Sequence, residues 1–292
     1  MKILLTNGNS WTFGSDLNSP RILAEPGELG FGKFKIYKWW LNDTSPENDN
    51  FRIPKIWPTK LAKSLGLKNI NLAWPSRSND IICTSTIGWV LDYLSKGGKP
   101  DDLLVVVGWG GPEWKHHLLR GDNSVISETI WPEVTDEKIY KFDNLLELFH
   151  LYRDHLNVEQ EFITRYVENN FHLHNFLESL SIKHLFFNCY WIRPGVVEPH
   201  LDIDISEIIE KWRSATVINN FGDTWSQDDE VARVLRSWES IPDSVLKMKN
   251  TMRTFRWYID NSLSVEQGYT KNSFHPSPES HALWAQHLKL IL

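Results

Sequence analysis

Short apolar runs, each closed by a turn signal such as Gly108, recur along the chain at residues 3–5, 103–107 and 185–190. Runs of this length that are rich in aliphatic and β-branched residues are typical of strands buried on both faces of a parallel sheet. A weaker run at residues 69–73 follows a helical pattern that stops at Gly66. The pattern therefore predicts four buried strands.

Longer stretches with helical spacing of apolar residues lie between these runs. Residues 80–95 present one apolar face, and residues 277–292 form a closing helix with proline in its first turn. The stretch at 142–180 is too long for one ordinary helix, so we expect two helices separated near residues 154–157. Strands alternate with helices, and this order predicts the α/β class.

At 292 residues, the chain is long enough for a single domain, residues 1–292, with a full core. Segments rich in Trp, Pro, Asp and Asn do not fit a minimal layered architecture. We interpret them as ordered insertions over one rim of the sheet, and in the last of them we expect a helical cap from residues 205–215 and 228–238. The insertions are predicted near residues 20–58, 110–140 and 195–268.

Composition narrows the class of protein. The net charge is -6, whereas binding the phosphates of a nucleic acid needs concentrated Lys and Arg. We therefore expect no nucleic-acid partner. Only two cysteines are present, Cys83 and Cys189, and each lies in an apolar stretch, so a disulfide framework is excluded. No segment reaches the roughly 20 apolar residues of a membrane span, so no membrane partner is expected. The N-terminus lacks the pattern of a signal peptide, which predicts cytoplasmic synthesis.

Two residues could carry chemistry. Ser10 follows the first strand, at the sheet edge where open α/β folds bind ligands, and His275 stands in a turn before the last helix. Imidazole is the usual base that activates a serine hydroxyl. Taken singly, Ser10 is as well explained as part of a helix cap, and His275 as one of eleven histidines.

Their sequence context resembles the SGNH/GDSL hydrolase family. Gly8-Asn9-Ser10 resembles the nucleophile block with Asn in place of Asp, and residues 272–275 resemble the Asp-x-x-His block, again with Asn for Asp. Residues 71–79 and 108–111 occupy the places of the two intermediate blocks. The Trp that follows Ser10 and the Gly-Trp pair of the block at 108–111 are also similar to SGNH-like proteins encoded by bacteriophages.

The resemblance implies a three-layer α/β/α sandwich with a flavodoxin-like parallel sheet, and hydrolysis of lipid or sugar esters. It implies Ser10 as nucleophile and His275 as base, with Asn272 where the family has the orienting acid. Since Asn cannot stabilise an imidazolium as a carboxylate does, another acid would have to replace it. The candidates are Asp16, Asp80 and Glu113.

The resemblance also places an oxyanion hole at Ser10, Ser76 and Gly110, although Gly110 lacks the side-chain amide that the family uses. Loss of one donor typically lowers the rate by two to three orders of magnitude, so we expect slow catalysis or none. Five residues in or beside the motif blocks are candidates for binding substrate: Asn9, Trp11, Trp74, Asn79 and Trp109. Other tryptophans lie in the insertions, where they either fill the core or form protein-binding surfaces.

Histidine pairs do not indicate a metal site. His116-His117 and His172-Leu173-His174 do not place two imidazoles on one helical face, and we found no Cys or carboxylate that completes a ligand set. We therefore expect no metal and no cofactor.

Two functions remain open at this point. The first is a serine esterase, with O-acetylated carbohydrate as one candidate substrate, which is motivated by Ser10 and His275. The second is a catalytically impaired binding or assembly module, such as a phage virion component, which is motivated by Asn9, Asn272, Ser76 and Gly110.

Overall fold

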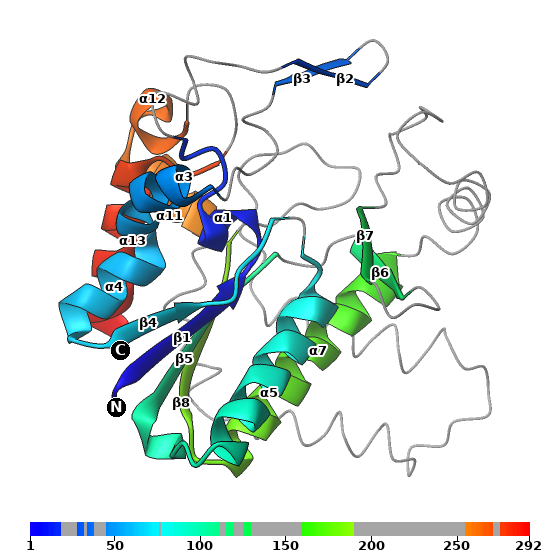
Figure 1. The fold of residues 1–292 in the computed structure, drawn as a ribbon, viewed down its shortest axis with the longest axis vertical. Helices are drawn as coiled ribbons and strands as arrows, with labels where there is room; N and C mark the ends of the chain where they lie inside the picture. The colour runs from blue at the N-terminus through cyan, green and yellow to red at the C-terminus, as the bar shows by residue number, and fades with distance from the viewer. Residues whose placement is uncertain are drawn as a thin grey trace.

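The four predicted strands form one parallel sheet in the order β4-β1-β5-β8 (Figure 1). They are β1 (Ile3–Gly8), β4 (Lys68–Asn71), β5 (Leu103–Trp109) and β8 (Lys183–Asn188). In this computed structural model, the described residues are 1–18, 28–31, 34–37, 45–75, 77–110, 115–119, 125–129, 159–189, 255–270 and 275–292. Strand β8 begins two residues before the predicted run.

Helices cover both faces of the sheet. One layer contains α4 (Trp57–Leu65), α11 (Phe255–Ser262) and α13 (Pro278–Ile291), whose buried residues share a core with Leu104 and Val106 of β5. The other contains α5 (Asn79–Ser95) and α7 (Glu159–Ser179), which share a core with Val105 and Val107. The predicted three-layer α/β/α sandwich is thus confirmed.

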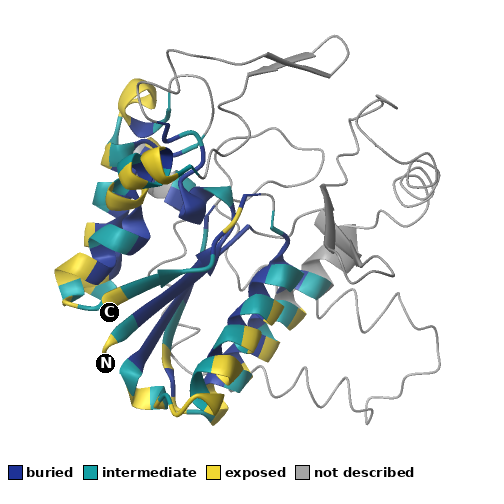
Figure 2. Ribbon diagram, viewed as in Figure 1, coloured by how far each residue is buried: buried dark blue, intermediate teal, exposed yellow. Residues whose placement is uncertain are grey.

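The sequence of β5 explains this layering. Successive side chains of a strand point to opposite faces, and every residue of β5 is buried (Figure 2). A strand covered by helices on both sides needs apolar residues at all positions rather than at alternate ones. The continuous run at residues 103–107 meets that need.

The remaining described elements are two-stranded sheets and short helices. Two antiparallel hairpins, β2–β3 and β6–β7, lie within the predicted insertions near 20–58 and 110–140. The bounds are α1 (Ser10–Phe13), β2 (Glu28–Phe31), β3 (Phe34–Tyr37), α3 (Pro46–Arg52), η2 (Ile53–Lys55), η3 (Pro100–Asp102), β6 (Lys115–Leu119), β7 (Val125–Thr129) and α12 (Val265–Gly268).

Helix α11 falls within the predicted insertion near 195–268, yet its Phe255 and Ile259 are fully buried in the core with α13. The predicted cap helices at 205–215 and 228–238 and the break near 154–157 lie outside the described residues. Within the described part of the chain, every helix is too short or too polar to cross a bilayer.

Candidate functional site

Ser10 is the first residue of the short helix α1, which starts directly after β1. Asn9 caps this helix, because its side-chain oxygen accepts a hydrogen bond from the Trp11 N–H at 3.0 Å. Gly8, at the end of β1, leaves room for the helix because it has no side chain. A Cβ at this position would lie 2.3 Å from Oγ1 of Thr12. Ser10 itself is half-buried at the carboxyl edge of the sheet.

The chain turns sharply after α1. Gly14 adopts a left-handed conformation with φ of 82°, and the N–H groups of Gly14 and Ser15 both donate to the Ser10 carbonyl, at 2.9 and 3.0 Å. Asp16 is also left-handed, with φ of 63°. These hydrogen bonds keep Ser10 and Asp16 on the two sides of one tight turn.

Asp16 contacts His275, 259 positions away in the chain. Its Oδ2 lies 2.7 Å from Nδ1 of His275, and the side chains are 10% and 27% exposed, respectively. Because a carboxylate only accepts hydrogen bonds, Nδ1 carries the proton, and the lone pair of the neutral imidazole is on Nε2. This is the tautomer that a general base requires.

The segment around His275 is fixed against α1. The His275 carbonyl accepts a hydrogen bond from the Thr270 N–H at 3.0 Å, and Tyr269 pairs with Pro276 in an isolated bridge. The ring of Tyr269 meets Trp11 edge-on, with centroids 6.3 Å apart. Trp11 adjoins Ser10 in the chain, so the segment around His275 packs against the helix that begins at Ser10.

Within the described residues, the Ser10 hydroxyl has no hydrogen-bond partner, so the dyad with His275 is not closed by a hydrogen bond in this structure. Catalytic hydrogen bonds are often long without substrate and shorten when it binds. The arrangement therefore holds His275 and Asp16 in place, and Ser10 lies on the turn that carries Asp16.

The three candidate acids have different surroundings. Asp16 is at His275, whereas Asp80 pairs with Arg165 and accepts a hydrogen bond from Asn169 at 2.7 Å. Asp80 is therefore engaged with α7. Glu113 and Asn272 lie outside the described residues.

The predicted oxyanion positions are only partly visible. Ser76 lies outside the described residues. The Gly110 N–H donates to Oδ1 of Asn79 at 3.0 Å, and this bond is buried. Asn79, predicted to bind substrate, thus ties the start of α5 to the end of β5, and the Gly110 N–H is already engaged.

The candidate tryptophans differ in exposure. Trp109 is completely buried against Phe186, and Trp11 is 5% exposed, so neither offers a ring face to a ligand in this structure. Trp74 is 49% exposed. The backbone N–H of Trp74 donates to the Gly8 carbonyl at 3.2 Å. Its ring contacts Phe13, which places it beside α1.

Arg52 supports the site, although nothing in the sequence pattern indicated it. Its Nη1 donates to the Phe13 carbonyl at 2.6 Å, and its guanidinium lies 3.6 Å from the Phe13 ring centroid. A cation at the last carbonyls of a helix complements them electrostatically. A lone arginine 39 positions from its partner carries no local signature of this role.

Comparison with protein families identifies a family to which the chain is similar. Residues 41–238, more than half of the chain, match the profile described as "Family of unknown function (DUF6071)". The chain belongs to this family. The matched DUF6071 region contains neither Ser10 nor His275. None of the curated proteins matches the sequence.

Solved structures provide distant similarities. A candidate lipolytic protein of the G-D-S-L family from Desulfitobacterium hafniense shares 13% identity at a TM-score of 0.44, with 100% of both chains covered. A carbohydrate esterase family 2 enzyme with a carbohydrate-binding domain from Corynascus thermopiles shares 11% identity at a TM-score of 0.38, with 99% of this chain and 66% of that chain covered. Such values assign no residue, so the contacts of His275 carry the functional conclusion.

Proposed function

We propose that this DUF6071 protein is a serine hydrolase of ester bonds, in which Ser10 is the nucleophile, His275 the general base and Asp16 the residue that orients His275. The observation that carries this proposal is the 2.7 Å contact between Asp16 Oδ2 and His275 Nδ1. It fixes the imidazole in the tautomer whose Nε2 can take a proton from a hydroxyl.

The proposed reaction has two halves. Ser10 Oγ attacks the ester carbonyl carbon while its proton passes to His275 Nε2, and Asp16 stabilises the resulting imidazolium. The tetrahedral intermediate then expels the alcohol, which takes that proton, and the acyl group stays on Ser10. Water attacks the acyl-enzyme, with His275 again as base, and the carboxylic acid leaves as Ser10 regains its proton.

Stabilisation of the oxyanion is expected to be the weak point. The Ser10 N–H and the residue at position 76 are the proposed donors, whereas Gly110 has no side chain and its N–H is bound to Asn79. A missing donor typically lowers kcat by about 10²–10³-fold. The proposal therefore predicts a slow esterase.

O-acetylated carbohydrate is the proposed substrate class. The half-exposed Trp74 ring beside α1 supports it, because aromatic faces next to a nucleophile provide a surface on which sugar rings stack. The alternative of a catalytically impaired assembly module was motivated by Asn9, Asn272, Ser76 and Gly110. The contact of Asp16 with His275 argues only against the part of it that concerns Asn272.

Covalent labelling tests the proposal. A fluorophosphonate probe should label the full chain at Ser10, as mapped by peptide mass spectrometry, and Ser10→Ala should remove both labelling and hydrolysis of p-nitrophenyl acetate. The matched control is Ser95→Ala, since Ser95 is exposed at the end of α5. Absence of labelling in folded wild-type protein, or unchanged hydrolysis in Ser10→Ala, would show that the proposal is wrong.

A further inference from the structure

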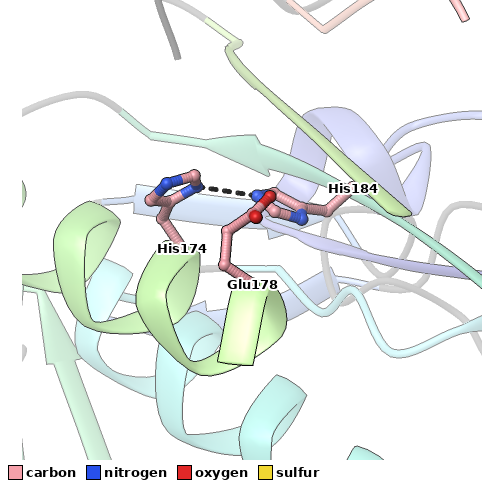
Figure 3. Close-up of side chains that lie close together, drawn as sticks. All are labelled: His174, Glu178 and His184. Atoms are coloured by element: carbon pink, nitrogen blue, oxygen red, sulfur yellow. Dashed lines mark hydrogen bonds between the residues drawn. The ribbon is translucent and has the colours of Figure 1, made fainter. Parts of the chain in front are cut away.

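A second cluster of chemically active side chains lies far along the chain from Ser10. His174 and Glu178 are one helical turn apart on α7, and His184 is the second residue of β8. One ligand atom from each residue lies within 4.8 Å of the others, and Figure 3 shows the three side chains directed toward one another. Residues at spacing i, i+4 share a helix face.

Hydrogen bonds orient the two imidazoles. Nδ1 of His184 lies 2.9 Å from the Ile182 carbonyl oxygen, which can only accept, so this nitrogen carries the ring proton. The lone pair of His184 is therefore on Nε2, which lies 2.8 Å from Nδ1 of His174. A backbone carbonyl that fixes one ring nitrogen so that the other can bind metal is the usual outer-sphere contact of a metal-binding histidine.

Burial gives the cluster a protected side and an open side. His174 is buried, His184 is half-buried, and Glu178 is exposed. The hydrophobic residues Leu173 and Leu177 hold this part of α7 in the core. The candidate ligands thus come from a helix and a strand of the core, and the Glu178 side chain is open to solvent.

We propose that His174 Nδ1, His184 Nε2 and the Glu178 carboxylate bind one Zn²⁺ ion, with water as the fourth ligand. Two histidines and one glutamate form a known zinc ligand set. Nitrogens about 2.0–2.1 Å from a tetrahedral ion lie about 3.3 Å apart, so the two nitrogens, which are 2.8 Å apart in a hydrogen bond, would separate by about 0.5 Å to admit the ion. His174 moves its proton from Nδ1 to Nε2 upon binding, so two neutral imidazoles release no net proton.

The spacing of His172 and His174 did not predict a metal site. The residues that join His174 are Glu178, which shares its helix face, and His184, which follows the turn into β8. Because the three residues lie on two different elements, α7 and β8, no local sequence pattern indicated the ligand set.

The position of the cluster separates the ion from the proposed ester hydrolysis. His184 stands at the amino end of β8, and Ser10 follows the carboxyl end of the parallel strand β1, so the two sites lie at opposite ends of the strands (Figure 1). An ion here would link α7 to β8. It would stabilise the folded chain by mass action without participating in ester hydrolysis.

Zinc titration of the EDTA-treated full chain tests this inference. We expect wild-type protein to bind one Zn²⁺ by isothermal titration calorimetry, and its Tm to rise by several degrees with zinc. Glu178→Gln and His184→Ala should each weaken binding by about tenfold or more, since each removes a ligand. The control His172→Ala alters an exposed histidine of the same helix and should bind zinc as wild-type does.

A spectroscopic readout accompanies the titration. Co²⁺ in place of Zn²⁺ should give visible d–d absorption in wild type and lose it in Glu178→Gln, whose exposed substitution leaves the fold intact by circular dichroism. No stoichiometric binding, or equal affinity in wild type and Glu178→Gln, overturns the proposal. Zinc should leave p-nitrophenyl acetate hydrolysis unchanged, which separates this outcome from that of the proposed function.

Discussion

Asp16 combines an uncommon backbone conformation with a key contact. Its φ of 63° lies in the left-handed region, which non-glycine residues other than Asn and Asp seldom adopt. The conformation lies immediately after the Gly14 turn and brings the carboxylate to Nδ1 of His275. Backbone strain at a residue that contacts a candidate base suits a functional site.

Asp16→Asn should therefore lower kcat for p-nitrophenyl acetate by roughly 10²–10⁴-fold, since an amide stabilises neither the required tautomer nor the imidazolium. The free energy of unfolding should change little, because Asn also tolerates the left-handed conformation. Steady-state kinetics and urea unfolding measure the two effects.

Asp80→Asn is the matched control for Asp16→Asn. Asp80 pairs with Arg165 and not with His275, so its substitution should leave kcat within a few-fold of wild type. If Asp16→Asn retains full activity, or if both variants lose activity equally, Asp16 does not orient the base.

At the scale of elements, a glycine ends each of the helices α1 and α4. Both end in a left-handed glycine, Gly14 with φ of 82° and Gly66 with φ of 68°. Their surroundings differ: a Cβ at Gly14 would lie 2.3 Å from Cγ2 of Ile56, whereas a Cβ at Gly66 meets nothing within 4 Å. Substitution of Gly66 therefore tests backbone strain alone, whereas substitution of Gly14 tests strain together with steric crowding.

Gly66→Ala should destabilise the protein by about 1 kcal/mol, which is the penalty of a left-handed alanine. Gly14→Ala should cost about 1–3 kcal/mol more, because Ile56 must also move. Esterase activity should fall only in Gly14→Ala, since Gly14 lies between Ser10 and Asp16. Urea unfolding measures both penalties; equal losses would contradict the crowding argument.

Local patterns predicted the elements whose signals are local. The continuous apolar run of β5, the helical spacing of α5 and the Gly66 stop of α4 all depend on near neighbours, and each predicted element is present. Helix α11 was assigned to an insertion because its core contacts, such as Phe255 with Trp284, come from distant parts of the chain.

The site follows the same division. The place of Ser10 after the first strand was predictable from that strand and its turn, as was His275 before the last helix. The partner of His275 was not, because three acids were candidates and only the folded chain brings Asp16 across 259 positions. The support of α1 by Arg52 likewise has no sequence pattern.

At the scale of the whole molecule, one helical layer joins segments from both ends of the chain. Helix α4 packs beside α13, and the Trp57 N–H at the start of α4 donates to Nδ1 of His281 in α13 at 3.3 Å. His281 is completely buried, and its Nε2 has no hydrogen-bond partner among the described residues. The packing of these helices therefore requires a neutral imidazole.

Burial, together with the nearby charges of Lys60 and His275, lowers the pKa of His281 from 6.5 to about 3. Between these values the unfolded chain binds one more proton than the folded chain, so the free energy of unfolding falls as the pH decreases below about 6.5. The loss from this group approaches about 1.4 kcal/mol per pH unit. Stability should therefore decline from pH 7.5 to pH 5, as measured by urea unfolding at each pH.

His281→Asn removes the titrating group and keeps an acceptor near the position of Nδ1. The variant should be less stable at neutral pH because the smaller side chain leaves a gap, but its stability should depend less steeply on pH. His172→Asn, at an exposed position, should retain the wild-type slope. Comparing slopes rather than absolute stabilities isolates His281 from the other histidines, and an unchanged slope in His281→Asn would mean that another group controls acid unfolding.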